Sequence, residues 1–406
     1  MDKDLFLRAL YTMAQHGTAP AEGCKFIGVG YENFFEAIKQ KYFYEQFGRN
    51  ICSQKFVVGP YGSGKTHFLR HLMEIARDEN CVTSETALNR DIDFSDKLLI
   101  YSEVVRNIKA PLQKNEGLSE FLRYTLNSMI NDTKNPQYLK ERFSKDINDS
   151  RFKSREFGKV LKLALISYIN NDISTFDLCC DYLLGNISDN KLCKELGIPK
   201  VTKSAQNKRA EDMLFSLFQF VYYIGYRGII VGFDEAEQSF NVDRKKLAKI
   251  FATLRSLLDA VVNLKDASAL IIYAMTNDVY EEMNKYPALQ QRLSSPYDKD
   301  FFSGNILAPV IDLTRLDSID LSKKIAMKIS DVFYDTFKDQ ISISKNELLK
   351  KADEISGEII RRGVSSSNKR EITKAVCTCL LGVLEGRECN SNILEINTQN
   401  IYEDEV

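Results

Sequence analysis

Short apolar runs alternate along this chain with longer segments in which apolar residues recur every three or four positions. The apolar runs have the length of strands and lie at 55–58, 81–88, 228–233, 269–274 and 307–313. The longer segments predict helices at 1–22, 31–47, about 66–77, 98–108, 205–226, 247–264 and through most of 314–385. Because apolar strands alternate with helices, the pattern indicates an α/β fold whose parallel sheet is covered on both faces.

A glycine-rich octapeptide joins the first predicted strand to the helix after it. It fits the P-loop pattern G-x4-G-K-[ST] at every fixed position. Glycines let the backbone turn its N–H groups toward phosphate oxygens, and the helix N-terminus adds partial positive charge. No [NT]KxD motif supports guanine, so we expect ATP, with Lys65 on the β- and γ-phosphates and Thr66 on Mg²⁺. The predicted ATP-binding residues are Gly59, Pro60, Tyr61, Gly62, Ser63, Gly64, Lys65, Thr66 and His67.

The strand at 228–233 ends in two adjacent carboxylates, Asp234 and Glu235. An acid at this strand end can hold Mg²⁺ opposite Thr66, so Asp234 is the second predicted metal ligand. Glu235 is predicted to polarise the attacking water, which a hydrolase needs and a kinase does not. The sequence therefore favours a Mg²⁺-dependent ATPase.

Three further residues are candidates for the catalytic site. Asn277 follows the strand at 269–274, where ATPases of the additional-strand class place a polar residue that orients the water; a strand-terminating Asn is also common turn chemistry. Arg292 stands where such ATPases often carry an arginine finger for a neighbouring subunit, a role that needs a homo-oligomer. Arg370 opens a C-terminal helix from which a lid arginine could contact the γ-phosphate. Surface arginines are abundant, so for both residues the alternative is an ordinary surface arginine without a catalytic role.

Spacing along the chain suggests how these parts are organised. Asp234 follows Lys65 by 169 positions, whereas two strand–helix–strand crossovers take roughly 60 residues. The excess matches the polar helical stretch 110–204, which we interpret as an insertion that the nucleotide core does not require and that binds a partner. The predicted division is an N-terminal helical segment at 1–50, a P-loop ATPase core at 51–305, and a C-terminal helical lid at 306–406.

Composition excludes several classes of protein. The net charge is -1, with 44% hydrophobic and 27% charged residues, so no global attraction to nucleic acid is expected. No run of eighteen apolar residues indicates a membrane span, and the start of the chain does not resemble a secretory signal. The nine cysteines lack zinc-site spacing. A cytoplasmic protein without membrane partners is expected.

Three segments resemble the BREX-system ATP-binding proteins (BrxD-like), in the AAA+/origin-recognition-like branch of P-loop ATPases. They are GCKFIGVGYE at 23–32, KFVVGPYGSGKTHFL at 55–69 and GYRGIIVGFDEAE at 225–237. The resemblance spans most of the chain and is weakest over 110–204. It implies an AAA+-like additional-strand P-loop fold with a helical insertion and a C-terminal, mainly helical lid or winged-helix-like domain.

The resemblance also implies a place in bacterial anti-phage defence. The implied partners are a superfamily 2 helicase and, as in Shango-type systems, a TerB-domain protein, with DNA contacted indirectly. Relatives carry a glycine–arginine pair near the adenine where this chain has Gly30 and Tyr31, and they often show Pro-Arg-Glu where it has Lys369, Arg370 and Glu371. Two alternatives to a remodelling ATPase stay open: a nucleotide-gated switch with slow hydrolysis, and a direct DNA translocase, for which no helicase motif set is present.

Overall fold

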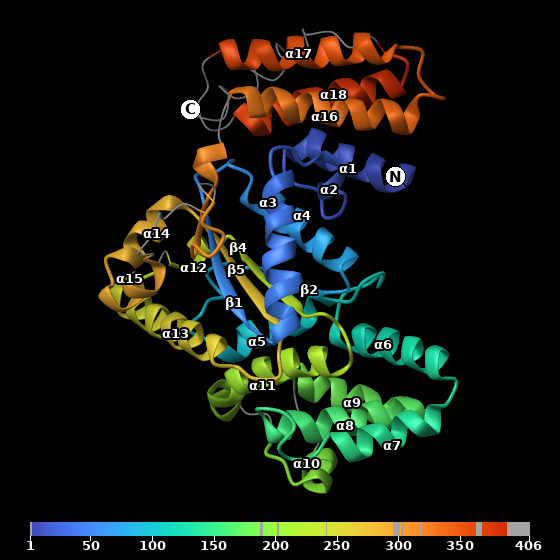
Figure 1. The fold of residues 1–406 in the computed structure, drawn as a ribbon, viewed down its shortest axis with the longest axis vertical. Helices are drawn as coiled ribbons and strands as arrows, with labels where there is room; N and C mark the ends of the chain where they lie inside the picture. The colour runs from blue at the N-terminus through green and yellow to red at the C-terminus, as the bar shows by residue number, and fades with distance from the viewer. Residues whose placement is uncertain are drawn as a thin grey trace, which may run out of the picture.

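The computed structural model describes residues 2–186, 190–200, 203–240, 242–294, 301, 304–316, 319–362 and 368–387. Helices and strands alternate in it as the sequence predicts (Figure 1). The strands are β1 (Ser53–Val58), β2 (Val82–Ala87), β3 (Ile108–Lys109), β4 (Ile229–Asp234), β5 (Ala269–Met275) and β6 (Val310–Asp312). Each predicted strand is present, and the two-residue β3 is an addition.

The six strands form one sheet in the order β3-β2-β4-β5-β1-β6. All neighbours run parallel except β2 and β3. Strand β5 lies between β1 and β4, with Met275 opposite Val58 and Tyr273 opposite Phe233. A strand inserted between the P-loop strand and the acidic strand is the feature that gives the additional-strand class its name, so the predicted fold class is confirmed.

Successive residues of a strand point to opposite faces of the sheet, so β1, β4, β5 and β6 each contribute to two hydrophobic clusters. Val57 packs on one face with Phe68 of α4, whereas Phe56 and Val58 pack on the other face with Tyr273. The first face is covered by α3 (Glu32–Ile38), the π-helix η1 (Lys39–Gln46), the 3-10 helix η2 (Phe47–Arg49) and α4 (Lys65–Asp78). The second is covered by α5 (Lys97–Arg106), α11 (Lys203–Tyr223), α12 (Ala236–Phe240), α13 (Arg244–Val262), α14 (Asn277–Asn284) and α15 (Pro287–Leu293).

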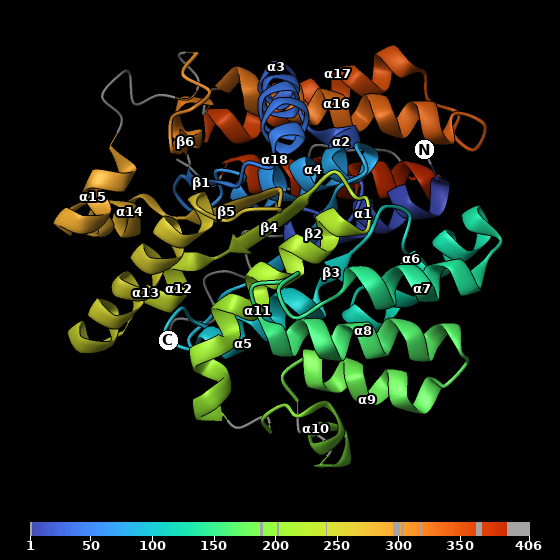
Figure 2. The ribbon, with the colours of Figure 1, turned by 60° about the horizontal axis from the view of Figure 1, so that its bottom comes forward.

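The insertion forms a helical body at the end of the molecule opposite the lid (Figures 1 and 2). It contains α6 (Leu118–Thr133), α7 (Pro136–Asp146), α8 (Arg155–Ile169), α9 (Ile173–Leu183) and α10 (Asn190–Leu196). Its buried side chains, including Phe121 and Leu161, belong to the same hydrophobic cluster as Val231 of β4. The insertion therefore packs onto the core and shares one hydrophobic cluster with α5 and α11, whereas its dispensability to nucleotide binding stays a prediction.

The N-terminal helices differ from the predicted 1–50 unit. Phe6 and Leu10 of α1 (Lys3–His16) lie in one hydrophobic cluster with Phe333 and Val376 of the C-terminal helices. Ile27 of α2 (Cys24–Ile27) joins the same cluster, whereas α3 covers the sheet. Helix α1 thus completes the C-terminal bundle (Figure 1), and the predicted segment is divided between two bodies.

The C-terminal region begins after the 3-10 helix η4 (Leu313–Leu316) and contains α16 (Ile319–Phe337), α17 (Lys345–Arg361) and α18 (Asn368–Leu384). Up to residue 387, the described part of this region is helical after β6, so it takes the form of a helical lid rather than of a winged helix. No helix in the described ranges is both long and apolar enough to span a membrane.

Candidate functional site

A cavity of about 430 Å³ lies between the carboxyl ends of the central strands and the lid bundle. Seven of the nine predicted ATP-binding residues line it, from Tyr61 through His67. Asp234, Glu235 and Arg370 line it as well, although they come from distant parts of the chain. The fold therefore brings most of the predicted site into one cavity at the strand ends, where α/β proteins bind ligands.

The P-loop backbone takes the conformation that its glycines allow. Gly62 and Gly64 have φ of +79° and +97°, values that other residues rarely adopt. At Gly59 a Cβ atom would lie 2.5 Å from Ser63 Oγ, so a side chain there would collide with the loop. Helix α4 begins at Lys65, and its N-terminus therefore faces the cavity with its unpaired N–H groups.

The ammonium of Lys65 is held inside the loop that carries it. Lys65 Nζ donates to the carbonyl oxygens of Gly59 at 2.9 Å and Pro60 at 3.2 Å, and lies 4.0 Å from Glu237 Oε1. Burial lowers the pKa of Lys65, while the nearby carboxylates, Glu237 first, oppose that shift. Gly59 and Pro60 do not line the cavity, but their carbonyl oxygens accept the hydrogen bonds from this ammonium.

The two predicted metal ligands meet directly. Thr66 Oγ1 donates a 2.6 Å hydrogen bond to Asp234 Oδ2, and Asp234 Oδ1 is buried without a hydrogen-bond partner among the described residues. Hydroxyl and carboxylate oxygens are the ligands that Mg²⁺ prefers, usually together with several waters. An unpaired buried acceptor next to the hydroxyl fits a hydrated Mg²⁺ at this position.

Glu235 lies at the rim of the cavity, with a φ of +52°, which is costly for a residue with a side chain. Its side chain is exposed, and Glu235 Oε2 accepts a 2.7 Å hydrogen bond from Gln238 Nε2. The predicted base thus lies next to the site, but its hydrogen bond with Gln238 of α12 holds it toward solvent.

Asn277 is the first residue of α14, directly beyond the end of β5. Its Oδ1 is buried and has no hydrogen-bond partner within the described residues. Strand β5 lies between β1 and β4, so Asn277 stands beyond the strand after which a water-orienting residue was predicted. Its side chain does not line the cavity. Its catalytic role stays a prediction.

The two predicted arginines lie in different surroundings. Arg370 is part of the cavity wall on α18, and the neighbouring Lys369 Nζ approaches Ser63 O at 3.5 Å. Arg292 is on α15, away from the cavity, and its guanidinium forms a bidentate ion pair with Asp259 at 2.5 and 2.6 Å. Arg370 therefore borders the cavity of its own chain, whereas Arg292 would have to leave Asp259 to serve a neighbouring chain.

The wall of the cavity away from the P-loop is largely apolar. It is built from α1, α2, the loops that follow each of them, and α16, with Met13, Ile27, Val29, Ile325 and Ile329 among its residues. Such a surface suits the flat, largely apolar face of a nucleotide base.

The comparisons with known proteins agree with this geometry. A family model described as BREX system ATP-binding protein BrxC/D matches residues 7–393, nearly the whole chain. The chain belongs to this BrxC/D family. ATP binding and a place in BREX defence follow from that membership. Curated proteins gave no match.

In this BrxC/D family member Tyr31 is buried in the cavity wall, at the position where the sequence resemblance expected an arginine. Its ring stacks with the ring of His67, with centroids 6.2 Å apart. Its hydroxyl lies close to the P-loop, because a Cβ atom added to Gly64 would be 3.4 Å from Tyr31 Oη. Burial lowers the pKa of His67 to about 3, so its imidazole is neutral at pH 7. This wall of the cavity therefore presents two uncharged aromatic rings, Tyr31 and His67.

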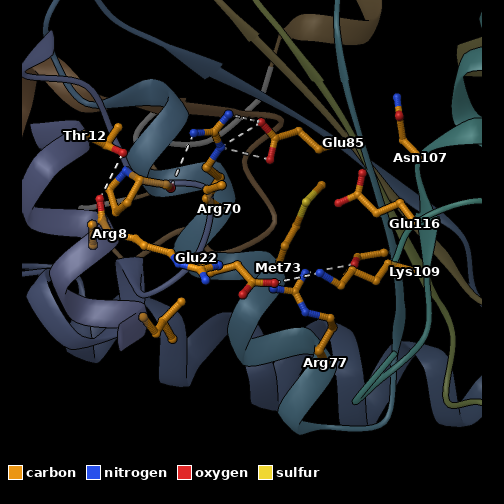
Figure 3. A pocket seen from close by; sticks show the side chains of 15 residues that line it. Arg8, Thr12, Glu22, Arg70, Met73, Arg77, Glu85, Asn107, Lys109 and Glu116 are labelled. Atoms are coloured by element: carbon orange, nitrogen blue, oxygen red, sulfur yellow. Dashed lines mark hydrogen bonds and ion pairs between the residues drawn. The ribbon is translucent and has the colours of Figure 1, made fainter. Parts of the chain in front are cut away.

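A second, smaller cavity of about 250 Å³ adjoins the nucleotide cavity and shares Arg70 and Glu85 with it (Figure 3). Arg70 Nε and Nη2 bind the Glu85 carboxylate at 2.8 Å, and Arg70 Nη1 donates to Ala19 O at 2.8 Å. Across the cavity, Lys109 Nζ pairs with Glu22 Oε1 at 2.7 Å. The contacts of Arg70 with Ala19 and of Lys109 with Glu22 link the loop after α1 to α4 and to the sheet.

Sequence reasoning assigned no role to two residues that the structure brings to the site, Glu237 and Lys369. A signal for Glu237 was present, because it is the last acid of the Asp-Glu-Ala-Glu run at 234–237. No local signal marks Lys369, since its approach to the P-loop depends on how the lid bundle packs.

Proposed function

We propose that this chain hydrolyses ATP with Mg²⁺. The observation that supports this most directly is the 2.6 Å hydrogen bond from Thr66 Oγ1 to Asp234 Oδ2, adjacent to the buried ammonium of Lys65. In this proposal the P-loop N–H groups and Lys65 bind the phosphates, and Thr66 and Asp234 hold Mg²⁺. The metal would neutralise phosphate charge when bound.

Glu235 is the proposed base. Its carboxylate would leave Gln238 and turn into the cavity, where it would accept a proton from the attacking water. Asn277, whose Oδ1 has no hydrogen-bond partner among the described residues, would turn toward the cavity to orient that water, and Arg370 would stabilise negative charge on the γ-phosphate. Closure of the lid bundle over the P-loop would exclude other water from the cavity.

We further propose that this hydrolysis drives assembly or remodelling with a partner of the same defence system. The partners suggested by the sequence resemblance are a superfamily 2 helicase and a TerB-domain protein, with DNA reached through them. The Shango-type assignment, the homo-oligomer and the cytoplasmic location remain predictions of the same kind.

The test is ATP turnover by the full chain, alone and with the operon-encoded helicase and DNA. Wild type is expected to turn over ATP in at least one combination, and Glu235→Gln to bind ATP normally while turnover falls by about 10²-fold or more. Lys65→Ala is expected to lose binding as well. Equal turnover by wild type and Glu235→Gln would remove Glu235 from the mechanism.

A nucleotide-gated switch is the second candidate, and two observations favour it. Glu235 is held toward solvent by Gln238, and Arg292 is paired with Asp259 in its own chain. If both contacts persist with ATP bound, ATP would set the state of the lid without rapid hydrolysis. Tight ATP binding with negligible turnover in every combination of partners would favour this function.

A further inference from the structure

A third carboxylate, Glu237, lies in the nucleotide cavity beside Lys65. It is on α12, and its side chain is 7% exposed. Glu237 Oε1 is 4.0 Å from Lys65 Nζ, and Oε2 is buried without a hydrogen-bond partner among the described residues. Burying a carboxylate with an unsatisfied oxygen is unfavourable, so its presence here needs a physical reason.

Lys65 provides that reason. Its two hydrogen bonds go to neutral carbonyl groups, which leave the full positive charge of a buried ammonium uncompensated. Within the described residues, Glu237 is the carboxylate at ion-pair distance from it. The other three acids that line the cavity are engaged elsewhere, Asp234 by Thr66, Glu235 by Gln238 and Glu85 by Arg70.

We propose that Glu237 is the internal counter-ion of Lys65, holding its ammonium in the nucleotide-free cavity and yielding it to the phosphates when ATP binds. The inference rests on the proposed ATP site. Glu237 opposes phosphate binding in two ways: it competes for Lys65, and its own charge repels the phosphates in a cavity that screens charge less than bulk water does. It thereby acts as a positioning residue that limits how tightly nucleotides, including the ADP product, are retained.

The substitution Glu237→Gln tests this, because it removes the charge and keeps the shape. Calorimetric titrations of the full chain would use three ligands: Mg–ATP, Mg–ADP and adenosine. The affinity for both phosphorylated ligands is expected to rise about three- to tenfold, as expected for loss of one partly screened like charge. The affinity for adenosine should not change, because adenosine carries no phosphate.

Asp278→Asn is the matched control. Asp278 is exposed and close enough to influence Tyr61 of the P-loop, so this variant makes the same charge change in solvent near the site. Its nucleotide affinities are expected to stay within about twofold of wild type. Glu237→Asp, which withdraws the carboxylate but keeps its charge, should give a smaller gain than Glu237→Gln.

Unchanged or weaker binding of Mg–ATP by Glu237→Gln would overturn the counter-ion role. An equal gain for adenosine would also overturn it, since that result would indicate a reshaped cavity rather than a charge effect. Failure of the wild-type chain to bind Mg–ATP would instead remove the proposed function itself, and the two failures are therefore distinguishable.

Discussion

Thr66 Oγ1 donates a 2.6 Å hydrogen bond to Asp234 Oδ2 and so joins the start of α4 to the end of β4. If these two groups hold Mg²⁺, Thr66→Ala should remove the enhancement of ATP binding by Mg²⁺, because the metal loses a ligand. Calorimetric titration with ATP, with and without Mg²⁺, measures that enhancement. A loss of at least about tenfold is expected in the presence of Mg²⁺.

Thr66→Ser is the control for this experiment, since it keeps the hydroxyl and removes only a methyl group. It should retain most of the Mg²⁺ effect. Equal losses in both variants would mean that the methyl packing of Thr66, and not its oxygen, maintains the site.

The parts of the site that the sequence predicted are those in which chemistry and geometry are local. Gly62 and Gly64 need positive φ, and Lys65 and Thr66 follow at fixed spacing, so eight consecutive residues determine the phosphate cradle. Asp234 could be added because a buried apolar strand rarely ends in adjacent acids unless a cation binds there.

The parts that were not predictable depend on packing between distant segments. The pairing of α1 with the C-terminal bundle joins Phe6 to Phe333, and nothing near Phe6 in the sequence specifies that partner. The ion pair between Arg292 and Asp259 is likewise set by the way α15 packs on α13. The sequence does not reveal this ion pair, and therefore it could not show that Arg292 is bound within its own chain rather than available to a neighbouring subunit.

The predicted finger role of Arg292 can be separated from its structural role by comparing Arg292→Ala with Asp259→Ala. Each variant breaks the same ion pair, whose partners are 27% and 48% exposed, so stability should change by less than about 1 kcal/mol in either. If Arg292 acts in a neighbouring site, only Arg292→Ala should lose turnover, by at least about tenfold.

Mixing supplies the second readout. An equimolar mixture of Arg292→Ala and Lys65→Ala should recover part of the activity, because the Lys65 variant can lend its arginine to the intact nucleotide site of the other. Equal loss of turnover in Arg292→Ala and Asp259→Ala would contradict the role of Arg292 in a neighbouring nucleotide site. A mixture that recovers no activity would contradict it as well.

Lys55 predicts a dependence of stability on pH. It is buried in β1, where Nζ donates to Ile306 O at 3.1 Å and to Ala308 O, and burial lowers its pKa to about 7. Between pH 7 and about 10.5 the unfolded chain holds a proton that the folded chain has lost, so stability rises with pH there, by at most about 1.4 kcal/mol per unit. Below pH 7 both states are protonated and this contribution is absent.

Lys55→Met removes the titrating group while keeping an unbranched side chain of similar length. Urea unfolding at several pH values should give a smaller rise in stability above pH 7 for this variant than for wild type. Parallel pH profiles for the two proteins would show that Lys55 keeps an ordinary pKa in the folded chain.

The last prediction concerns the contact that sets the lid over the nucleotide cavity. Gly17 ends α1 with a φ of +61°, and a Cβ atom there would lie 2.4 Å from Arg370 Cγ and 2.8 Å from Arg370 O. Gly197 has a nearly identical φ of +59° and open space where its Cβ would stand. Gly197→Ala therefore measures the backbone strain alone, expected at about 1–2 kcal/mol.

Gly17→Ala should cost about 1–3 kcal/mol more than this control, because α18 must also shift away from α1. The shift would move Arg370 relative to the P-loop, so ATP affinity should fall in Gly17→Ala and stay at the wild-type value in Gly197→Ala. Urea unfolding and nucleotide titration of the two variants measure both effects. Equal stability losses with equal ATP affinities would mean that the close packing of Gly17 on Arg370 does not position the lid.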